Sequence, residues 1–222
     1  MSKKILIVAA TKHEVELALS IFKISVNDEV GLFTSSKFPL DISILITGVG
    51  MVNTAFLMGK HVTQHYDYII NAGICGAFNR NLKIGEVVNV CEDTISEMGA
   101  ENGDDFIKYA DLNLGGSNVF KGLIQVENTT LTILKKVNAI TVNTIHGSEE
   151  SVKKSSVRFN ADVESMEGAA FFSSCNKLAK NYMQIRAISN YVEKRDKSKW
   201  NIPLAISNLN ETVIKIIYEI CN

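Results

Sequence analysis

Strand-like and helix-like segments alternate along most of this chain of 222 residues. Short apolar runs predict strands, and longer stretches with apolar residues three or four positions apart predict helices. The predicted strands are residues 5–9, 42–47, 68–71, 86–91, 139–144 and 183–189. The predicted helices are residues 14–22, 52–65, 148–159, 166–180 and 202–220, and residues 92–125 form a long excursion. This alternation favours one α/β domain, residues 1–222, with a largely parallel sheet.

Composition excludes several classes of protein. The chain is 46% hydrophobic and 21% charged, with a net charge of -1, so it has no basic field to hold nucleic acid. Its apolar runs are strand-sized, well short of the roughly 20 residues that span a membrane. The four cysteines are not spaced like metal ligands, which indicates reduced thiols. We therefore expect a cytoplasmic protein with no metal, no cofactor, and no nucleic-acid or membrane partner.

Ligands of α/β sheets bind beyond the carboxyl ends of the strands, so the residues that follow each predicted strand are candidates. Thr11 and Glu14 follow the first strand with the T-x-x-E spacing of a helix capping box. The alternative is that Glu14 faces the crevice as a base, kept ionised by the helix N-terminus. Spacing alone leaves both interpretations open.

Glycines follow the next two strands. Residues 47–51 contain Gly48 and Gly50, but Asn53 stands where a dinucleotide fingerprint needs its third glycine. Residues 71–77 contain Gly73, followed by Ile74. Either segment allows a ligand to approach the backbone closely or forms a tight turn. Gly50, Gly73 and Ile74 are therefore candidate binding residues.

Two late segments place polar groups at element boundaries. Residues 162–170 put Glu167 into small, apolar surroundings at the start of a helix, where a carboxylate needs a polar partner. We expect ligand hydroxyls, not a protein group, to be that partner. Asn190 ends the last strand, and its amide donates and accepts at once, which suits a purine edge. The alternative for Asn190 is an Asx-type turn.

Residues 164–170 and 186–192, with Arg195, Asp196 and Trp200, resemble the nucleoside phosphorylase and nucleosidase superfamily, and within it the futalosine hydrolases. The resemblance implies a single α/β domain with a central mixed, partly barrel-like sheet flanked by helices. It also implies a subunit of a homo-oligomer, often a dimer, that cleaves the N-glycosidic bond of a purine nucleoside.

The resemblance also implies roles for individual residues. Glu14 matches the glutamate that activates water in related nucleosidases, and Met166 and Glu167 match the pair that holds the ribose. Such a base, with no phosphate-binding cluster around it, favours hydrolysis over phosphorolysis.

The resemblance also implies which residues surround the purine base. Thr144 and Ile145 match the segment that walls the base. Asn190 stands where adenine-specific members carry an acidic residue, and an amide that hydrogen-bonds N7 and O6 favours hypoxanthine.

The expected reaction is hydrolysis of futalosine to hypoxanthine and dehypoxanthine futalosine, a step of menaquinone biosynthesis that the resemblance implies. Futalosine carries an aryl carboxylate, which Arg195 could pair and Trp200 could stack against. The alternatives are a methylthioadenosine/adenosylhomocysteine nucleosidase, a purine nucleoside phosphorylase, and a non-catalytic nucleoside-binding protein.

Overall fold

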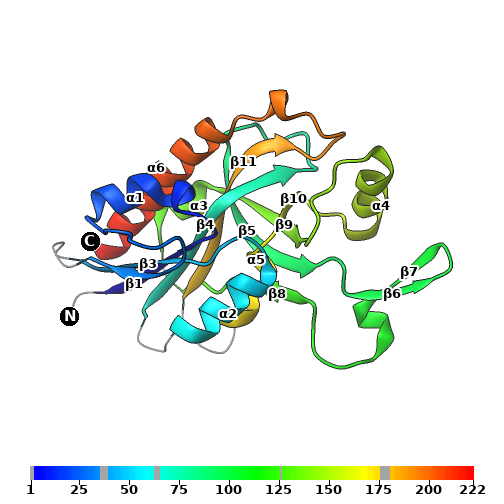
Figure 1. Cartoon of the computed structure of the whole chain (residues 1–222), viewed down its shortest axis with the longest axis horizontal. Coiled ribbons are helices and arrows are strands. Elements are labelled where there is room, and N and C mark those ends of the chain that lie inside the picture. The colour runs from blue at the N-terminus through cyan, green and yellow to red at the C-terminus, as the bar shows by residue number, and fades with distance from the viewer. Residues whose placement is uncertain (1–2, 36–39, 63–65, 126, 176–180) are drawn as a thin grey trace.

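The protein is built around one twisted sheet with helices on both faces (Figure 1). The computed structural model describes residues 3–35, 40–62, 66–125, 127–175 and 181–222. Its strands are β1 (Lys4–Ala9), β2 (Gly31–Thr34), β3 (Asp41–Ile46), β4 (Tyr68–Ala77), β5 (Val87–Ile95), β6 (Gly99–Asn102), β7 (Asp105–Lys108), β8 (Val119–Lys121), β9 (Lys135–Thr141), β10 (Val163–Ser165) and β11 (Tyr182–Tyr191). Its α-helices are α1 (Glu16–Ile21), α2 (Met51–His61), α3 (Thr129–Ile133), α4 (Glu149–Phe159), α5 (Gly168–Cys175) and α6 (Ile202–Cys221), with 3-10 turns at Lys12–Val15, Tyr109–Leu112 and Lys197–Lys199.

Five strands of the sheet close into a ring. The order β4, β11, β5, β9, β10 returns to its start because β10 pairs with both β9 and β4. Strands β1, β3 and β2 extend from β4 as an open wing. The sheet is mixed and barrel-like, as the resemblance implies, and not largely parallel as the alternation alone predicts. A short connection without a helix follows β4, so β5 runs antiparallel to β11, which itself is parallel to β4.

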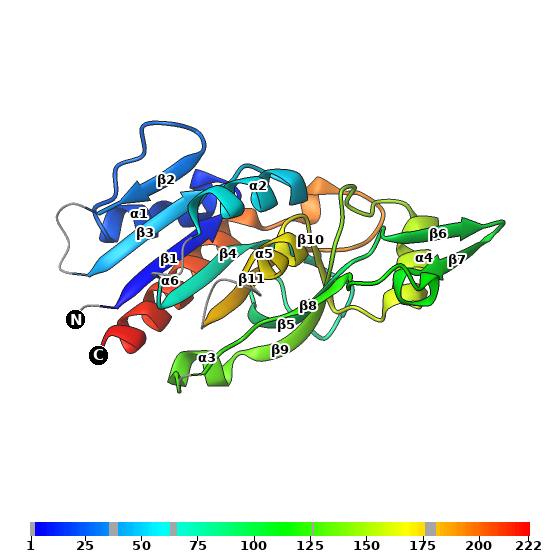
Figure 2. The ribbon, with the colours of Figure 1, turned by 90° about the horizontal axis from the view of Figure 1, so that it is seen from below.

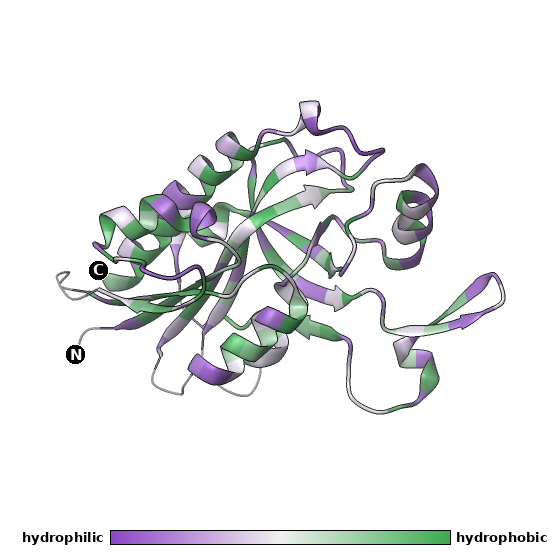
Figure 3. Cartoon of the chain, viewed as in Figure 1, coloured by the Kyte–Doolittle hydropathy of each residue, from purple (hydrophilic) through white to green (hydrophobic). Residues whose placement is uncertain are grey.

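The sheet is buried on both faces. Successive residues of β1 point to opposite sides: Ile5 and Ile7 pack in the cluster that contains the buried face of α6, whereas Leu6 and Val8 pack with residues of α2 and α5. A strand covered on both faces has no polar side, which explains its unbroken apolar run. Figure 3 shows this apolar character along the central strands.

The 20-residue α6 covers one face of the sheet. It begins after Asn201, whose side chain accepts the Leu204 N–H, and Pro203 lies in its first turn. Its buried residues include Leu209, Val213 and Ile217. No helix of the described residues is long and apolar enough to cross a membrane.

Several predicted boundaries are wrong. The strand predicted at 68–71 continues as β4 to Ala77, so the glycines of this segment lie in a strand and not in a turn. The excursion at 92–125 contains the end of β5, the β6–β7 hairpin and β8, and the hairpin lies beside α4 at the end opposite both termini (Figures 1 and 2). The predicted strand 139–144 is β9, which ends at Thr141. The predicted ends of two helices, residues 63–65 and 176–180, lie outside the described residues.

Candidate active site

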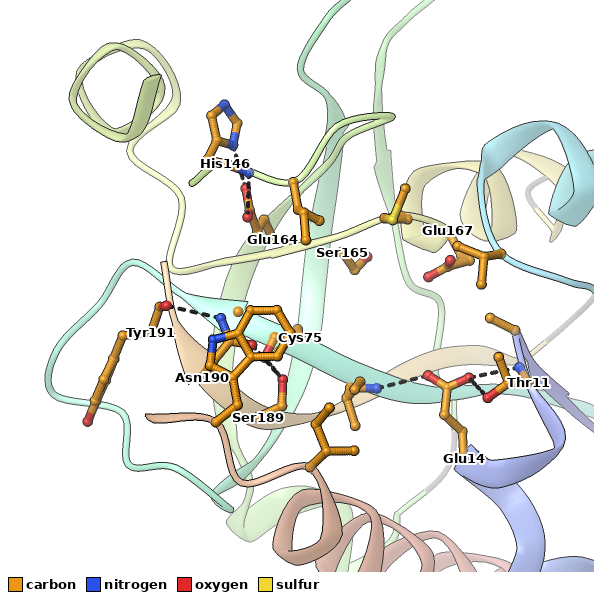
Figure 4. A pocket seen from close by; sticks show the side chains of 18 of the residues that line it. Thr11, Glu14, Cys75, His146, Glu164, Ser165, Glu167, Ser189, Asn190 and Tyr191 are labelled. Carbon is orange, nitrogen blue, oxygen red and sulfur yellow. Dashed lines mark hydrogen bonds and ion pairs between the residues drawn. The ribbon is translucent and has the colours of Figure 1, made fainter. Parts of the chain in front are cut away.

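A cavity of about 310 Å³ opens where the carboxyl ends of β1, β4, β10 and β11 meet the start of α6 (Figure 4). Carboxylates line its inner part, and the segment after β11 forms its outer part. The predicted site residues that line it are Glu14, Ile74, Ile145, Met166, Glu167, Asn190, Arg195 and Trp200. The residues that follow these strands therefore meet at one cavity.

Glu14 completes the capping box and also lies on the cavity wall. Its Oε2 accepts the backbone N–H of Thr11 at 2.9 Å and the Thr11 hydroxyl at 3.1 Å, as in a capping box. Its Oε1 accepts the Ile74 N–H at 3.2 Å, and the side chain is only 8% exposed at the cavity wall. Burial raises the pKa of Glu14 above 4.5, against the lowering effect of the Arg186 guanidinium, and the charge of Glu167 raises it further. A carboxylate of raised pKa is the stronger proton acceptor.

The backbone of Glu14 is held by a residue from the far end of the chain. Asn210 of α6 donates from its amide to the Glu14 carbonyl at 2.9 Å and accepts the Ala18 N–H at 3.2 Å. Asn210 is buried, so both bonds are shielded from water. In the sequence, Asn210 is an asparagine on the apolar face of a helix. This position indicates a buried polar contact, but it does not indicate which residue Asn210 contacts.

Glu167 has partners within the protein, which corrects the expectation that ligand hydroxyls alone would supply them. Its Oε1 accepts the Gly50 N–H at 3.0 Å, and its Oε2 lies 3.9 Å from the Arg186 guanidinium. Gly50 adopts φ +99°, a conformation that favours glycine, and this turn directs its N–H at Glu167. One edge of the carboxylate remains on the cavity wall, where a hydroxyl can reach it.

Arg186 is the central site residue that sequence reasoning missed. It is 1% exposed in β11, and its guanidinium donates to Asn71 Oδ1 at 2.5 Å. A Cβ at position 73 would lie 1.9 Å from Arg186 Nη1, so Gly73 is needed to make room for the guanidinium. Gly73 therefore supports the site from beneath and does not line the cavity. The signal for Arg186 in the sequence is an arginine within a predicted strand of mostly apolar residues.

A second buried carboxylate lies behind Glu167. Asp93 accepts the Thr141 hydroxyl at 2.7 Å and the Gln184 amide at 3.0 Å. Burial raises the pKa of Asp93 to about 6, with both hydrogen bonds and Arg186 opposing the shift. Gly168 leaves room for this cluster, since a Cβ there would lie 2.1 Å from Asp93 Oδ2. The cluster supports the start of α5 directly behind the Met166–Glu167 pair.

Asn190 lies at the cavity with its amide orientation fixed. Oδ1 accepts the Ser189 hydroxyl at 2.7 Å, and Nδ2 donates to the Tyr191 carbonyl at 3.0 Å. One amide hydrogen is left over, because the NH2 group has two. Both the local turn-like bonding and the ligand-facing position that the sequence leaves open are present.

The outer end of the cavity carries its cations. The Arg195 guanidinium stacks over the Trp200 ring at 5.1 Å, and the Arg195 N–H donates to the Gly147 carbonyl at 3.1 Å. That bond ties the segment after β11 to the loop of Ile145. In the part of the chain that the structure describes, no carboxylate pairs with Arg195.

Other predicted residues differ in position. Thr144 is exposed and is not among the residues that line the cavity. His146, which was not a candidate site residue, lines the cavity and contacts Glu164. Cys75 also reaches the wall, but burial raises the pKa of its thiol to about 12, which argues against a nucleophilic thiolate.

Residues 4–218 match the phosphorylase superfamily. The chain is 28% identical over 181 residues to a futalosine hydrolase of Thermus thermophilus, covering 79% of this chain and 80% of that protein. Two solved structures share the fold. A 5′-methylthioadenosine/S-adenosylhomocysteine nucleosidase of Colwellia psychrerythraea in complex with adenine has a TM-score of 0.78 at 21% identity, covering 99% and 96% of the two chains. A futalosine hydrolase of Helicobacter pylori has a TM-score of 0.82 at 15% identity, covering 99% of each chain.

The family match covers nearly the whole chain and confirms the superfamily that the late motifs resemble. The fold similarity confirms the α/β architecture with its mixed, partly closed sheet. The chain belongs to the phosphorylase superfamily.

Proposed function

We propose that the protein hydrolyses the N-glycosidic bond of a 6-oxopurine nucleoside, and that its substrate is futalosine. The observation that carries the proposal is the grouping of Glu14, Glu167 and Asn190 around one cavity, each with an orientation fixed by hydrogen bonds. The name of the Thermus thermophilus relative supports futalosine as the substrate.

The proposed reaction follows from these positions. Glu14 takes a proton from water while the water oxygen forms a bond to C1′ of the ribose. The C1′–N9 bond breaks, its electron pair leaves with the purine, and the base takes a proton from solvent. Glu167 accepts hydrogen bonds from the ribose hydroxyls, and its charge favours the oxocarbenium-like transition state. Asn190 donates a hydrogen bond to the departing base.

The charge distribution favours water over phosphate as the attacking group. Phosphate needs cations or a nest of backbone donors beside C1′. The two backbone N–H groups at the inner end are already taken by Glu14, and the lysine and arginine that line the cavity, Lys194 and Arg195, belong to its outer part. Arg186 is fully buried between Asn71 and Glu167. A phosphate dianion beside Glu14 would be repelled.

The deciding experiment is a free-base assay on futalosine, inosine and methylthioadenosine, each with and without phosphate. We expect release of hypoxanthine from futalosine at a rate that does not depend on phosphate. Release of adenine from methylthioadenosine as the fastest reaction would make the protein an adenine nucleosidase. Dependence on phosphate would make it a phosphorylase, and binding without release would make it a nucleoside-binding protein.

Replacing Asn190 by aspartate is expected to weaken release of hypoxanthine. Aspartate is acceptor-only when ionised, so it loses the hydrogen bond that the amide donates to the base, and when protonated it suits adenine. We expect kcat/KM to fall about 10-fold for inosine and to rise for adenosine, in line with one hydrogen bond. An unchanged ratio of the two values would show that Asn190 does not set base choice.

Replacing Arg195 by alanine is expected to raise KM for futalosine by about 10-fold or more, because a two-pronged pair with the aryl carboxylate is lost. Inosine lacks that carboxylate, so its KM should change much less. Arg158→Ala is the control, since Arg158 stacks over the Phe106 ring and does not line the cavity. Equal effects of Arg195→Ala on both substrates would show that Arg195 does not read the carboxylate.

We also expect a homo-oligomer in the cytoplasm. Val49, Val52 and Phe56, on α2 and just before it, expose apolar side chains beside the cavity entrance. Burying such residues against a second copy is favourable. Light scattering of the purified protein should give at least twice the monomer mass of 24.5 kDa, and a monomer at micromolar concentration would contradict the expectation.

A further inference from the structure

Glu164 is a buried carboxylate on the cavity wall that the proposed reaction does not use. It is 4% exposed in β10, between the purine side of the cavity and the loop that contains Ile145. Oε1 accepts the His146 N–H at 3.1 Å, and Oε2 lies 2.5 Å from His146 Nδ1 (Figure 4). The His146 ring packs edge-on against Phe78 at 6.0 Å, which holds the pair in place.

Glu164 and Asn190 lie over the same point of the backbone. Strand pairing sets Glu164 opposite Gly76, and a Cβ on Gly76 would lie 3.7 Å from Glu164 Cγ and 3.3 Å from Asn190 Nδ2. A base that reaches the amide of Asn190 therefore has Glu164 beside it. Val192 Cγ2 would lie 2.9 Å from the same Cβ, so a glycine at position 76 is needed for these side chains to meet at this point of the cavity wall.

The chemistry of the two groups differs in a way that matters for base choice. The amide of Asn190 is held in one orientation, and its remaining hydrogen favours a 6-oxo over a 6-amino group by one hydrogen bond. An ionised carboxylate only accepts, and its oxygens have lone pairs beyond those that His146 uses. Ring nitrogen N1 carries a hydrogen in a 6-oxopurine, whereas in adenine N1 is a lone pair.

We propose that Glu164, held by His146, selects 6-oxopurines over 6-aminopurines by accepting the N1–H of the base. The inference rests on the proposed function and adds its specificity-determining residue. Adenine would place its N1 lone pair against a buried carboxylate, which is the repulsive element that specificity requires. Glu164 then adds to the preference for 6-oxopurines that Asn190 provides.

The test is calorimetric titration of hypoxanthine and adenine into the wild-type protein and Glu164→Gln. The wild type is expected to prefer hypoxanthine. Glu164→Gln should lose about 10- to 100-fold of that preference, the worth of a hydrogen bond to a charged group, because glutamine can donate to adenine N1. Glu86→Gln is the matched control, since Glu86 pairs with Lys135 outside the cavity, and it should keep the preference.

The outcomes separate this inference from the proposed function. A wild-type protein that prefers adenine, or binds neither base, would overturn both. A wild-type preference for hypoxanthine that Glu164→Gln retains would overturn the inference alone. Equal weakening of both bases would also overturn it, since Glu164 would then only brace the loop of Ile145. If circular dichroism shows that Glu164→Gln does not fold, His146→Gln is the second variant, because it removes the ring that holds the Glu164 carboxylate. His146→Gln should lower the preference for hypoxanthine by a smaller factor. An unchanged preference in His146→Gln would overturn the inference.

Discussion

Replacing Glu14 by glutamine is expected to lower kcat by about 10²- to 10⁴-fold, the usual contribution of a general base. The amide keeps the size of the side chain and an acceptor oxygen for Thr11 or Ile74, so the variant should fold normally. It cannot take a proton from water. Glu16→Gln is the matched control, because Glu16 lies two residues further on and is exposed.

The pH profile gives the same test without mutation. The pKa of Glu14 is raised above 4.5 by burial, and the base acts only when ionised. As the pH is lowered, kcat/KM should therefore begin to fall at a pH above 4.5, because the Glu14 carboxylate takes up a proton there. Glu14→Gln should lack that acid limb. A near-native rate in Glu14→Gln would reduce Glu14 to its capping role.

Replacing Glu167 by glutamine is expected to lower kcat/KM by about 10²- to 10³-fold, the effect of losing one charged contact to a developing transition state. Stability should fall too, because Arg186 loses a buried counter-charge, although Asn71 still accepts from its guanidinium. The sequence alone, which predicts that Glu167 contacts only the ligand, predicts no such loss of stability.

The sharpest readout for Glu167 is a comparison of inosine with 2′-deoxyinosine. The wild type should prefer the ribonucleoside, because the role we propose for Glu167 is to accept a hydrogen bond from the 2′-hydroxyl. Glu167→Gln should lose most of that preference. A variant with a lower melting temperature but an unchanged ribo-to-deoxy ratio would make Glu167 a structural residue.

Residues that follow strands could be located from the sequence. Glu14 and Asn190 are far apart in the chain, yet each follows an apolar run. Strands β1, β4 and β11 run in parallel and bring these two positions to one edge, as periodicity predicts. Glu167 follows the three-residue β10, which runs antiparallel to β4, and periodicity does not predict that pairing. The superfamily was recognisable for the same reason, since its motifs lie at those ends.

Contacts between distant elements could not be located in this way. Gly73 and Gly76 lower strand propensity, so β4 looked four residues long, although β1, β11 and β10 together pair with all ten of its residues. Asn210 and Arg186 are polar residues in apolar elements, and their partners are set by how the elements pack. No local pattern states which carbonyl or carboxylate a buried donor will meet.

The close approach of Gly73 to Arg186 links two positions that lie more than a hundred residues apart. Since a methyl group at 73 and a guanidinium at 186 would occupy the same space, position 73 cannot gain a side chain while Arg186 keeps its place. We therefore expect homologues with alanine at the first position to carry a shorter residue at the second. In such homologues Glu167 would lack its counter-charge, and substitutions at all three positions should be inherited together.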